Sequence, residues 1–113
     1  MEASATIRYL RSTARKARLV AAEVRGRKVG DALMQLQYGS GRRVAKDMAK
    51  LLKSAVANLQ NRNAETALDV DTLRVKELRV DNGPTMKRLR PRAQGRGYRI
   101  LKRMCHITVT VAS

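Results

Sequence analysis

The sequence predicts an α+β fold: three helices packed on a small antiparallel three-stranded sheet, with a long basic β-hairpin arm. Alternating apolar residues at 73–80 and 107–111 indicate strands. Between them, residues 82–103 contain both prolines of the chain and eight basic residues, but no acidic one. Apolar residues recur at helical spacing between residues 12 and 62. Together these observations predict the order strand, three helices, strand, arm, strand.

The composition predicts one domain, residues 1–113, with a large excess of positive charge. A chain of 113 residues is long enough for one modest core. Its formal net charge of +16 costs compact-state stability through self-repulsion unless a partner of opposite sign neutralises it. Half of that charge, +8, lies from residue 82 onward. A small domain of this kind is expected to bind nucleic acid.

The sequence gives no sign of secretion or of a membrane span. Cys105 is the single cysteine, so no disulfide framework is expected. No stretch reaches 18 consecutive apolar residues, and the N-terminus lacks the apolar core of a signal peptide. We expect a cytoplasmic protein with no membrane partner.

The first strand leads into a helix that combines an apolar face with a basic one. Residues 3–10 include alternating apolar side chains and predict the strand, and Ser12 stands where the N-cap of the helix is expected. The apolar face predicts the packing side of the helix and consists of Ala17, Val20, Ala21 and Val24. An arginine stripe on another face is left for a partner and consists of Arg11, Arg15, Arg18 and Arg25. Gly26 is expected to end the helix, and Arg27 and Lys28 extend the basic surface.

Two further helices are predicted at residues 29–38 and 42–62, with Ser40 between them as a possible cap. The shorter helix buries Val29, Leu33 and Leu36. The longer one has apolar residues at three- and four-residue spacing, namely Val44, Met48, Leu51, Leu52, Ala55 and Leu59. Its basic residues are expected to lie mostly in solvent; they are Arg42, Arg43, Lys46, Lys50 and Lys53. A polar loop is expected from about residue 61.

The strand at residues 73–80 has a break in its alternation. Leu73 and Val75 are in one phase, whereas Leu78 and Val80 are in the other. Two explanations remain open: either a β-bulge lies near Lys76 and Glu77, or the two halves of the strand bury opposite faces.

The arm, residues 82–103, has too few apolar residues to build a core of its own. We expect it to be mobile alone and ordered only against a polyanion. If residues 84–99 pair as a ribbon, each side extends on the order of 25 Å, which is longer than a duplex is wide. Such a finger is expected to thread between the helices of a large folded nucleic acid.

Catalytic and metal-binding chemistry is not expected. His106 is the only histidine, and it lies beside Cys105 on a predicted strand, where adjacent side chains point to opposite faces. A metal pair is therefore not expected, and no second pair completes four ligands. We predict no metal, no cofactor and no enzymatic activity; His106 is expected to be structural or to contact RNA.

Two stretches resemble the bacterial large-subunit ribosomal protein twenty-two family. The first is matched by Ser12, Lys16, Arg18, Leu19, Val20, Ala21, Arg25, Gly26 and Val29. The second is more specific and is matched by Val80, Asp81, Gly83, Pro84, Met86, Lys87, Arg88, Pro91, Arg92, Ala93, Gly95, Arg96, Lys102, Arg103, His106, Ile107, Thr108 and Val109. The chain departs from the family pattern at Asn82, usually Glu, at Gly97, commonly Ala, and at Gln94, frequently basic.

The resemblance implies a structural constituent of the large ribosomal subunit. Members of that family bind large-subunit ribosomal RNA during assembly, beside neighbouring ribosomal proteins. Their globular part lies near the exit of the nascent-peptide tunnel, and their arm lines the tunnel wall, where changes at the tip are linked to macrolide resistance. A monomer before assembly is implied, located in the cytoplasmic ribosome, with the nascent peptide passing the arm.

The residues and the resemblance together assign two sets of site residues. The RNA-binding set is Arg11, Arg15, Lys16, Arg18, Arg25, Arg27, Lys28, Lys87, Arg88, Arg90, Arg92, Arg96, Arg99, Lys102, Arg103 and His106. The tunnel-lining arm tip is Met86, Lys87, Arg88, Leu89, Arg90, Pro91, Arg92, Ala93, Gln94 and Gly95. The alternative is a DNA-architectural protein, because β-ribbon arms with proline also wrap duplex DNA. Such proteins usually dimerise, and the sequence shows no obvious dimer seam.

Overall fold

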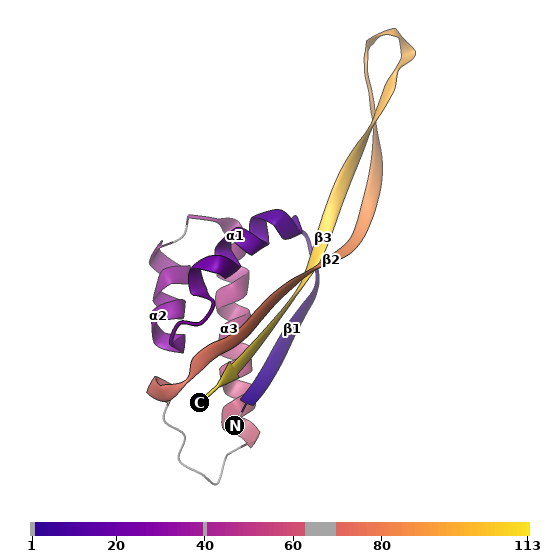
Figure 1. Ribbon diagram of the computed structural model, residues 1–113. Helices are drawn as coiled ribbons and strands as arrows, with labels where there is room; N and C mark the ends of the chain where they lie inside the picture. Colours follow the sequence, from indigo (N-terminus) through magenta and orange to yellow (C-terminus); the bar gives the residue numbers. More distant parts are fainter. Residues whose placement is uncertain (1, 40, 63–69) are drawn as a thin grey trace.

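A computed structural model describes residues 2–39, 41–62 and 70–113 and confirms the predicted α+β fold. Within these residues, three α-helices cover one face of a three-stranded antiparallel sheet, and a hairpin projects beyond it (Figure 1). The elements are β1 (Glu2–Leu10), α1 (Ala14–Val24), α2 (Val29–Met34), the π-helix η1 (Gln35–Gly39), α3 (Arg43–Arg62), the 3-10 turn η2 (Val70–Thr72), β2 (Arg74–Pro91), the 3-10 turn η3 (Ala93–Gly95) and β3 (Gly97–Ala112).

The last strand, β3, lies at the centre of the sheet, whose order is β1-β3-β2. It pairs with β1 from Glu2 opposite Ala112 to Ile7 opposite Ile107. It pairs with β2 over a much longer stretch, which continues past the body of the protein as the arm. Both chain termini lie at the end of the molecule away from the arm (Figure 1).

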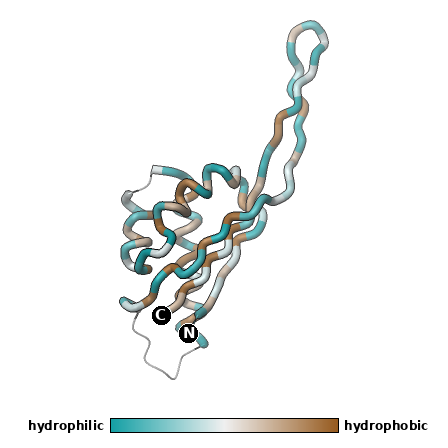
Figure 2. Tube along the Cα trace, in the orientation of Figure 1, coloured by the Kyte–Doolittle hydropathy of each residue, from teal (hydrophilic) through white to brown (hydrophobic). Residues whose placement is uncertain are grey.

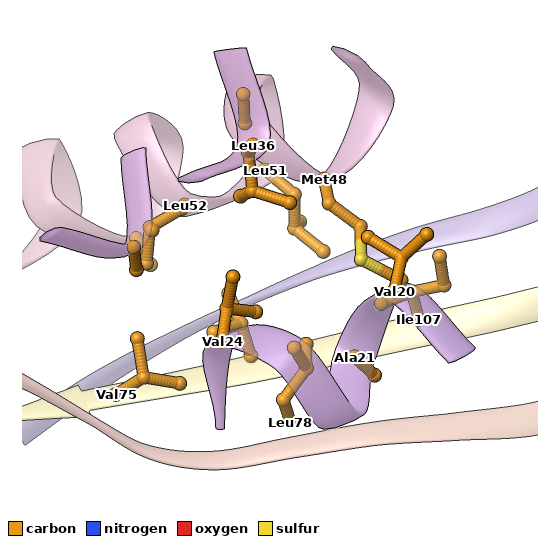
Figure 3. Packing of buried hydrophobic residues seen from close by; sticks show 14 of the residues in the cluster. Val20, Ala21, Val24, Leu36, Met48, Leu51, Leu52, Val75, Leu78 and Ile107 are labelled. Atoms are coloured by element: carbon orange, nitrogen blue, oxygen red, sulfur yellow. The ribbon is translucent and has the colours of Figure 1, made fainter. Parts of the chain in front are cut away.

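The core lies between the helices and the covered face of the sheet. Alternate residues of β3 point into it and are buried, namely Cys105, Ile107, Val109 and Val111. The predicted apolar face of α1 is confirmed, since all four of its residues are buried. Figure 3 shows side chains of α1, α3 and the sheet directed toward one another in this cluster. Figure 2 shows the arm as mostly teal and white, with brown limited to a short stretch.

A β-bulge explains the break in alternation on β2. Val75 lies opposite Val111 and Glu77 lies opposite Thr110, so Lys76 is the extra residue. Because of this insertion, all four apolar residues of the segment face the core: Leu73, Val75, Leu78 and Val80 are buried. The bulge prediction is confirmed, and the alternative of two opposite buried faces is wrong.

Several predicted element ends are wrong by a residue or more. Thr13, not Ser12, is the N-cap of α1: its Oγ1 accepts the N–H of Lys16 at 3.3 Å. Ser12 belongs instead to the turn after β1, where its N–H donates to the carbonyl of Leu10 at 2.8 Å. The shorter predicted helix is α only to Met34 and continues as the π-helix. The predicted cap Ser40 and most of the predicted polar loop lie outside the described residues.

Gly26 lies just after the end of α1, as predicted. Gly26 has a φ of +81°, the left-handed conformation that follows many helix ends. From there the chain runs along the edge of β2, and the N–H of Gly26 donates to the carbonyl of Val75 at 3.1 Å. Arg27 and Val75, and then Val29 and Leu73, make further backbone hydrogen bonds at 2.9 and 3.0 Å. This segment therefore acts as a short extra strand along part of that edge.

The arm makes the molecule long and thin. The principal extents are 67 × 26 × 16 Å, and the radius of gyration is 17.4 Å. A compact chain of this size would have a radius of gyration of roughly 13 Å. A second bulge lies at the root of the arm, because the pair Asn82–Cys105 is followed by Thr85–Arg103. Gly83 and Pro84 occupy this bulge, where a proline removes no ladder hydrogen bond.

Candidate nucleic-acid interface

The arm presents its positive charge without placing cations directly opposite each other. Across residues 85–103, all of them described, each paired Lys or Arg faces an uncharged residue. The pairs are Thr85–Arg103, Met86–Lys102, Lys87–Leu101, Arg88–Ile100, Leu89–Arg99 and Arg90–Tyr98. Shifting the pairing by one or two residues in either direction would set at least one pair of cations face to face. Directly opposed like charges destabilise a ribbon, so this register suits a charged arm.

The tip of the arm is a five-residue loop whose side chains are all exposed. The N–H of Arg92 donates to the carbonyl of Arg96 at 2.7 Å and closes the loop. Gln94 and Gly95 have φ values of +66° and +69°, so the chain reverses through two left-handed residues. A shallow hollow at the tip is lined by Arg92, Ala93, Gln94, Arg96 and Tyr98. Of the ten predicted tip residues, Met86 is half-buried and the others are exposed.

Two residues of the arginine stripe on α1 bind the protein itself. The Nε and Nη2 of Arg25 donate to the carbonyl of Leu78 at 3.2 and 2.7 Å. The Nη2 of Arg18 donates to the carbonyl of Val80 at 3.2 Å. Because β2 is an edge strand, these bonds satisfy carbonyls that have no strand partner on that side. Both residues are exposed as a whole, but these bonds tie their guanidinium groups to the edge of the sheet.

The other edge of the sheet is covered in the same way by α3. The Nδ2 of Asn58 donates to the carbonyl of Ser4 at 3.1 Å, and the Nη1 of Arg62 donates to the carbonyl of Glu2 at 3.3 Å. Side chains from helices therefore bond to backbone carbonyls of both edge strands.

The uncovered face of the sheet carries a more balanced set of charges. Glu2, Glu77 and Asp81 are exposed there beside Arg74, Lys76 and Arg79. Lys76 Nζ donates to Glu2 Oε2 at 2.6 Å, and this bond lowers the pKa of the Glu2 carboxyl and raises the pKa of Lys76. Arg79 Nε lies 3.2 Å from Asp81 Oδ2. Since carboxylates repel phosphates, the arm and the helix side are the better surface for a polyanion.

His106 and Cys105 point to opposite faces of β3, as predicted. Cys105 is fully buried, and this burial raises the pKa of its thiol, against a smaller opposing effect of the Arg18 charge. His106 is half-buried on the uncovered face, where its Nδ1 accepts the N–H of Tyr9. The described part of the chain contains no group of three or more His, Cys, Asp or Glu side chains that could hold a metal ion.

A basic hollow lies where the arm leaves the body. Its lining includes residues that were predicted to lie mostly in solvent. It is lined by Arg11, Ser12, Thr13, Lys16, Arg42, Arg43, Val44, Leu101, Lys102 and Arg103. Arg11, Lys16, Lys102 and Arg103 were predicted to contact RNA, but Arg42 and Arg43 were not. The sequence predicts that Arg42 and Arg43 lie at the start of α3. It does not predict that the start of α3 lies beside the root of the arm.

Helices that could span a membrane are not found among the described residues, since none of them is sufficiently long and apolar. The family model for ribosomal protein L22p/L17e matches residues 5–112 of the chain. This match covers the body and the whole arm.

Proposed function

Because the chain belongs to the ribosomal protein L22p/L17e family, we propose that its arm enters folded large-subunit ribosomal RNA and lines the nascent-peptide tunnel. Membership makes the chain a structural ribosomal protein that binds ribosomal RNA, and not an enzyme. In this proposal the protein also supports assembly of the large subunit, because its arm holds RNA segments together.

The shape and charge of the arm are the observation that carries this proposal. Beyond the bulge at Gly83 and Pro84 it consists of two strands joined by the turn η3, and no helix in the described part of the chain covers either face of these strands (Figure 1). Its basic side chains are exposed, and the sequence has no acid after Asp81. A thin ribbon of this kind fits between RNA helices, where phosphates neutralise it from both faces.

The contacts to RNA are assigned to the predicted basic residues of α1, of the segment after it and of the arm. In this proposal, Arg18 and Arg25 hold β2 carbonyls with some of their N–H groups and meet phosphates with the remaining ones. Residues 1–113 act as a single RNA-binding domain, with the arm at about residues 82–103. The tip from Met86 to Gly95, exposed except for the half-buried Met86, lines the tunnel, and the nascent peptide passes it.

Two features of the sheet favour a monomer before assembly. The carbonyls of Leu78 and Val80 on one edge, and those of Glu2 and Ser4 on the other, already accept hydrogen bonds from helix side chains. Edge-to-edge pairing of two copies would have to break these bonds. This counts against the DNA-architectural alternative, because such proteins usually dimerise to present two arms.

A salt titration tests the proposal. Binding to a large-subunit ribosomal RNA transcript and to duplex DNA of equal length is measured for the intact chain and for a chain lacking residues 85–98. Each phosphate contact contributes a slope of roughly −0.7 to −0.9 in log K against log salt. We expect tighter RNA than DNA binding at high salt, and loss of that preference without the arm. Equal affinity for both, or a preference for DNA, would overturn the proposal.

The shortened chain is a usable control because none of the buried core residues lies between residues 82 and 104. Circular dichroism is expected to show retained helices in it. Loss of the helices would mean that the arm stabilises the body, and alanine substitutions at Lys87, Arg88 and Arg90 would then replace the deletion.

A further inference from the structure

The strongest unassigned feature is the basic hollow between the arm root and the first turns of α1 and α3. We propose that it is a phosphate clamp: it holds one RNA strand against both the body and the arm, and thereby sets the direction of the arm. This inference rests on the proposed function, because it takes ribosomal RNA as the partner. It adds a defined binding site and a positional role for that site.

Three segments far apart in the sequence form the walls. Residues 11–16 lead into α1, residues 42–44 begin α3, and residues 101–103 lie on β3 where the arm leaves the sheet. Figure 1 shows both helices beginning at the end of the body nearest the arm. The hollow carries six exposed cations, Arg11, Lys16, Arg42, Arg43, Lys102 and Arg103.

The charges of this hollow need a counter-charge. None of the residues that line it is acidic. An adjoining hollow that also includes Arg11 and Arg43 contains one carboxylate, that of the half-buried Asp47. One carboxylate cannot balance the five cations of the lining other than Arg42, so the free protein has a strong positive potential here. Successive phosphates of one RNA strand provide several negative charges along one path, so one strand can neutralise more than one of these cations.

The two helix starts add to this potential. Neither α1 nor α3 has an acidic residue in its first turn, so no side chain of that turn neutralises the positive end of the helix. Ser12 and Thr13 also bring two hydroxyl groups to the lining. The side of the hollow formed by the body is therefore suited to phosphate oxygens.

The position of the hollow explains why an occupant would orient the arm. Pairing between β2 and β3 is interrupted between Asn82–Cys105 and Thr85–Arg103. Lys102 and Arg103 lie immediately on the arm side of this interruption, whereas the other cations of the hollow belong to the body. A strand bound to both groups would link the two sides of the bulge. Without it, only the two backbone strands connect them.

The test compares two pairs of substitutions with equal loss of charge. The clamp variant is R43Q together with K102Q, one residue from each wall. The control variant is K50Q together with K53Q, two exposed residues of α3 outside the hollow. Spin labels are attached through Ala57→Cys on α3 and Ala93→Cys at the tip. The distance distribution between them is measured without and with saturating ribosomal RNA transcript.

We expect RNA to narrow the distribution in the parent and in the control variant, but not in the clamp variant. The salt slope of RNA binding should fall by roughly 0.7–0.9 for each phosphate contact that the clamp variant loses. If both variants narrow alike, the clamp is wrong while the proposed function stands. If the parent shows no salt-dependent RNA binding, the proposed function is wrong as well. If inorganic sulfate alone narrows the parent distribution equally, the assignment to an RNA strand is overturned.

Discussion

The backbone N–H of Tyr9 donates a hydrogen bond to Nδ1 of His106 at 3.0 Å, and the two rings meet edge to face with centroids 5.0 Å apart. Tyr9 has a backbone φ of +57°, a value that residues other than glycine rarely adopt. The regular pairing of β1 with β3 ends just before it, at Ile7. The hydrogen bond from Tyr9 to His106 therefore stabilises an unfavourable left-handed backbone conformation at the end of β1. This contact gives His106 a structural role.

His106→Ala is expected to lower the free energy of unfolding by about 1 kcal/mol, the net value of one hydrogen bond. His106→Asn offers another acceptor near the N–H of Tyr9 and should lose less. Urea denaturation of the two variants measures the difference. Equal losses would show that the ring contact, and not the hydrogen bond, stabilises this end of the strand.

Arg25→Ala and Arg15→Ala are expected to affect different properties. Arg25 donates two hydrogen bonds to the carbonyl of Leu78, so its loss should cost about 1 kcal/mol of stability. Arg15 is exposed, and its loss should leave stability unchanged while weakening RNA binding. Urea denaturation and filter binding measure the two effects. Identical stability of the two variants would contradict the role of Arg25 at the strand edge.

Gly83→Ala is expected to destabilise the root of the arm. A Cβ added at Gly83 would lie 3.1 Å from the carbonyl carbon and oxygen of Met104, so backbone has to move. Overpacking of this kind costs about 1–3 kcal/mol. Gly30→Ala, in α2, meets nothing within 4 Å and should stabilise the helix by about 0.5–1 kcal/mol. Thermal melting of both variants should show shifts of opposite sign.

Leu89→Lys is expected to weaken strand pairing in the arm, because residue 89 lies opposite Arg99. Like charges in that position are destabilising, by roughly 0.2–1 kcal/mol. Leu89→Glu has the same exposed location but the opposite sign and should strengthen the pairing. Amide hydrogen exchange of residues 86–102 without RNA measures both. Faster exchange in the Glu variant than in the Lys variant would refute the role of charge in this register.

The thiol of Cys105 is expected to resist alkylation in the folded protein and to react readily in urea. Burial raises its pKa, so less of the reactive thiolate is present at a given pH. The raised pKa also makes folding stability depend on pH. The neutral buried thiol contributes fully to the free energy of unfolding below the pKa of the unfolded thiol, and this contribution is lost as the pH rises through the raised pKa of the folded protein. Cys105→Ala should remove that part of the alkaline pH dependence. Equal alkylation rates in folded and unfolded protein would contradict the burial.

The parts of the fold that sequence analysis predicted correctly are those with a repeating pattern of burial. The α1 face of Val20 and Val24, and the bulge at Lys76, both follow from the period of apolar residues. A helix N-cap depends instead on the backbone conformation of a single residue and on the reach of its side chain to an N–H of the first turn. Ser12 and Thr13 are both good cap residues, and only the turn from Leu10 decides between them.

The site was predictable in its charge but not in its geometry. Density of basic residues marked the arm and α1, because charge can be counted along a chain. The bonds of Arg18 and Arg25 to β2 depend on which strand becomes the sheet edge, which no local pattern specifies. For the same reason the nearness of Arg43 to Lys102 could not be read from residues that lie so far apart in the chain.

The central place of β3 in the sheet also determines how the arm resists being pulled. A force along the arm axis is transmitted into β3, which is hydrogen-bonded to β1 on one side and to β2 on the other. Its bonds to β1 would be loaded in shear, all together, instead of being opened one after another from an end. A pull on the tip is thus resisted by the hydrogen bonds between β1 and β3 acting together, and not by the root of the arm alone.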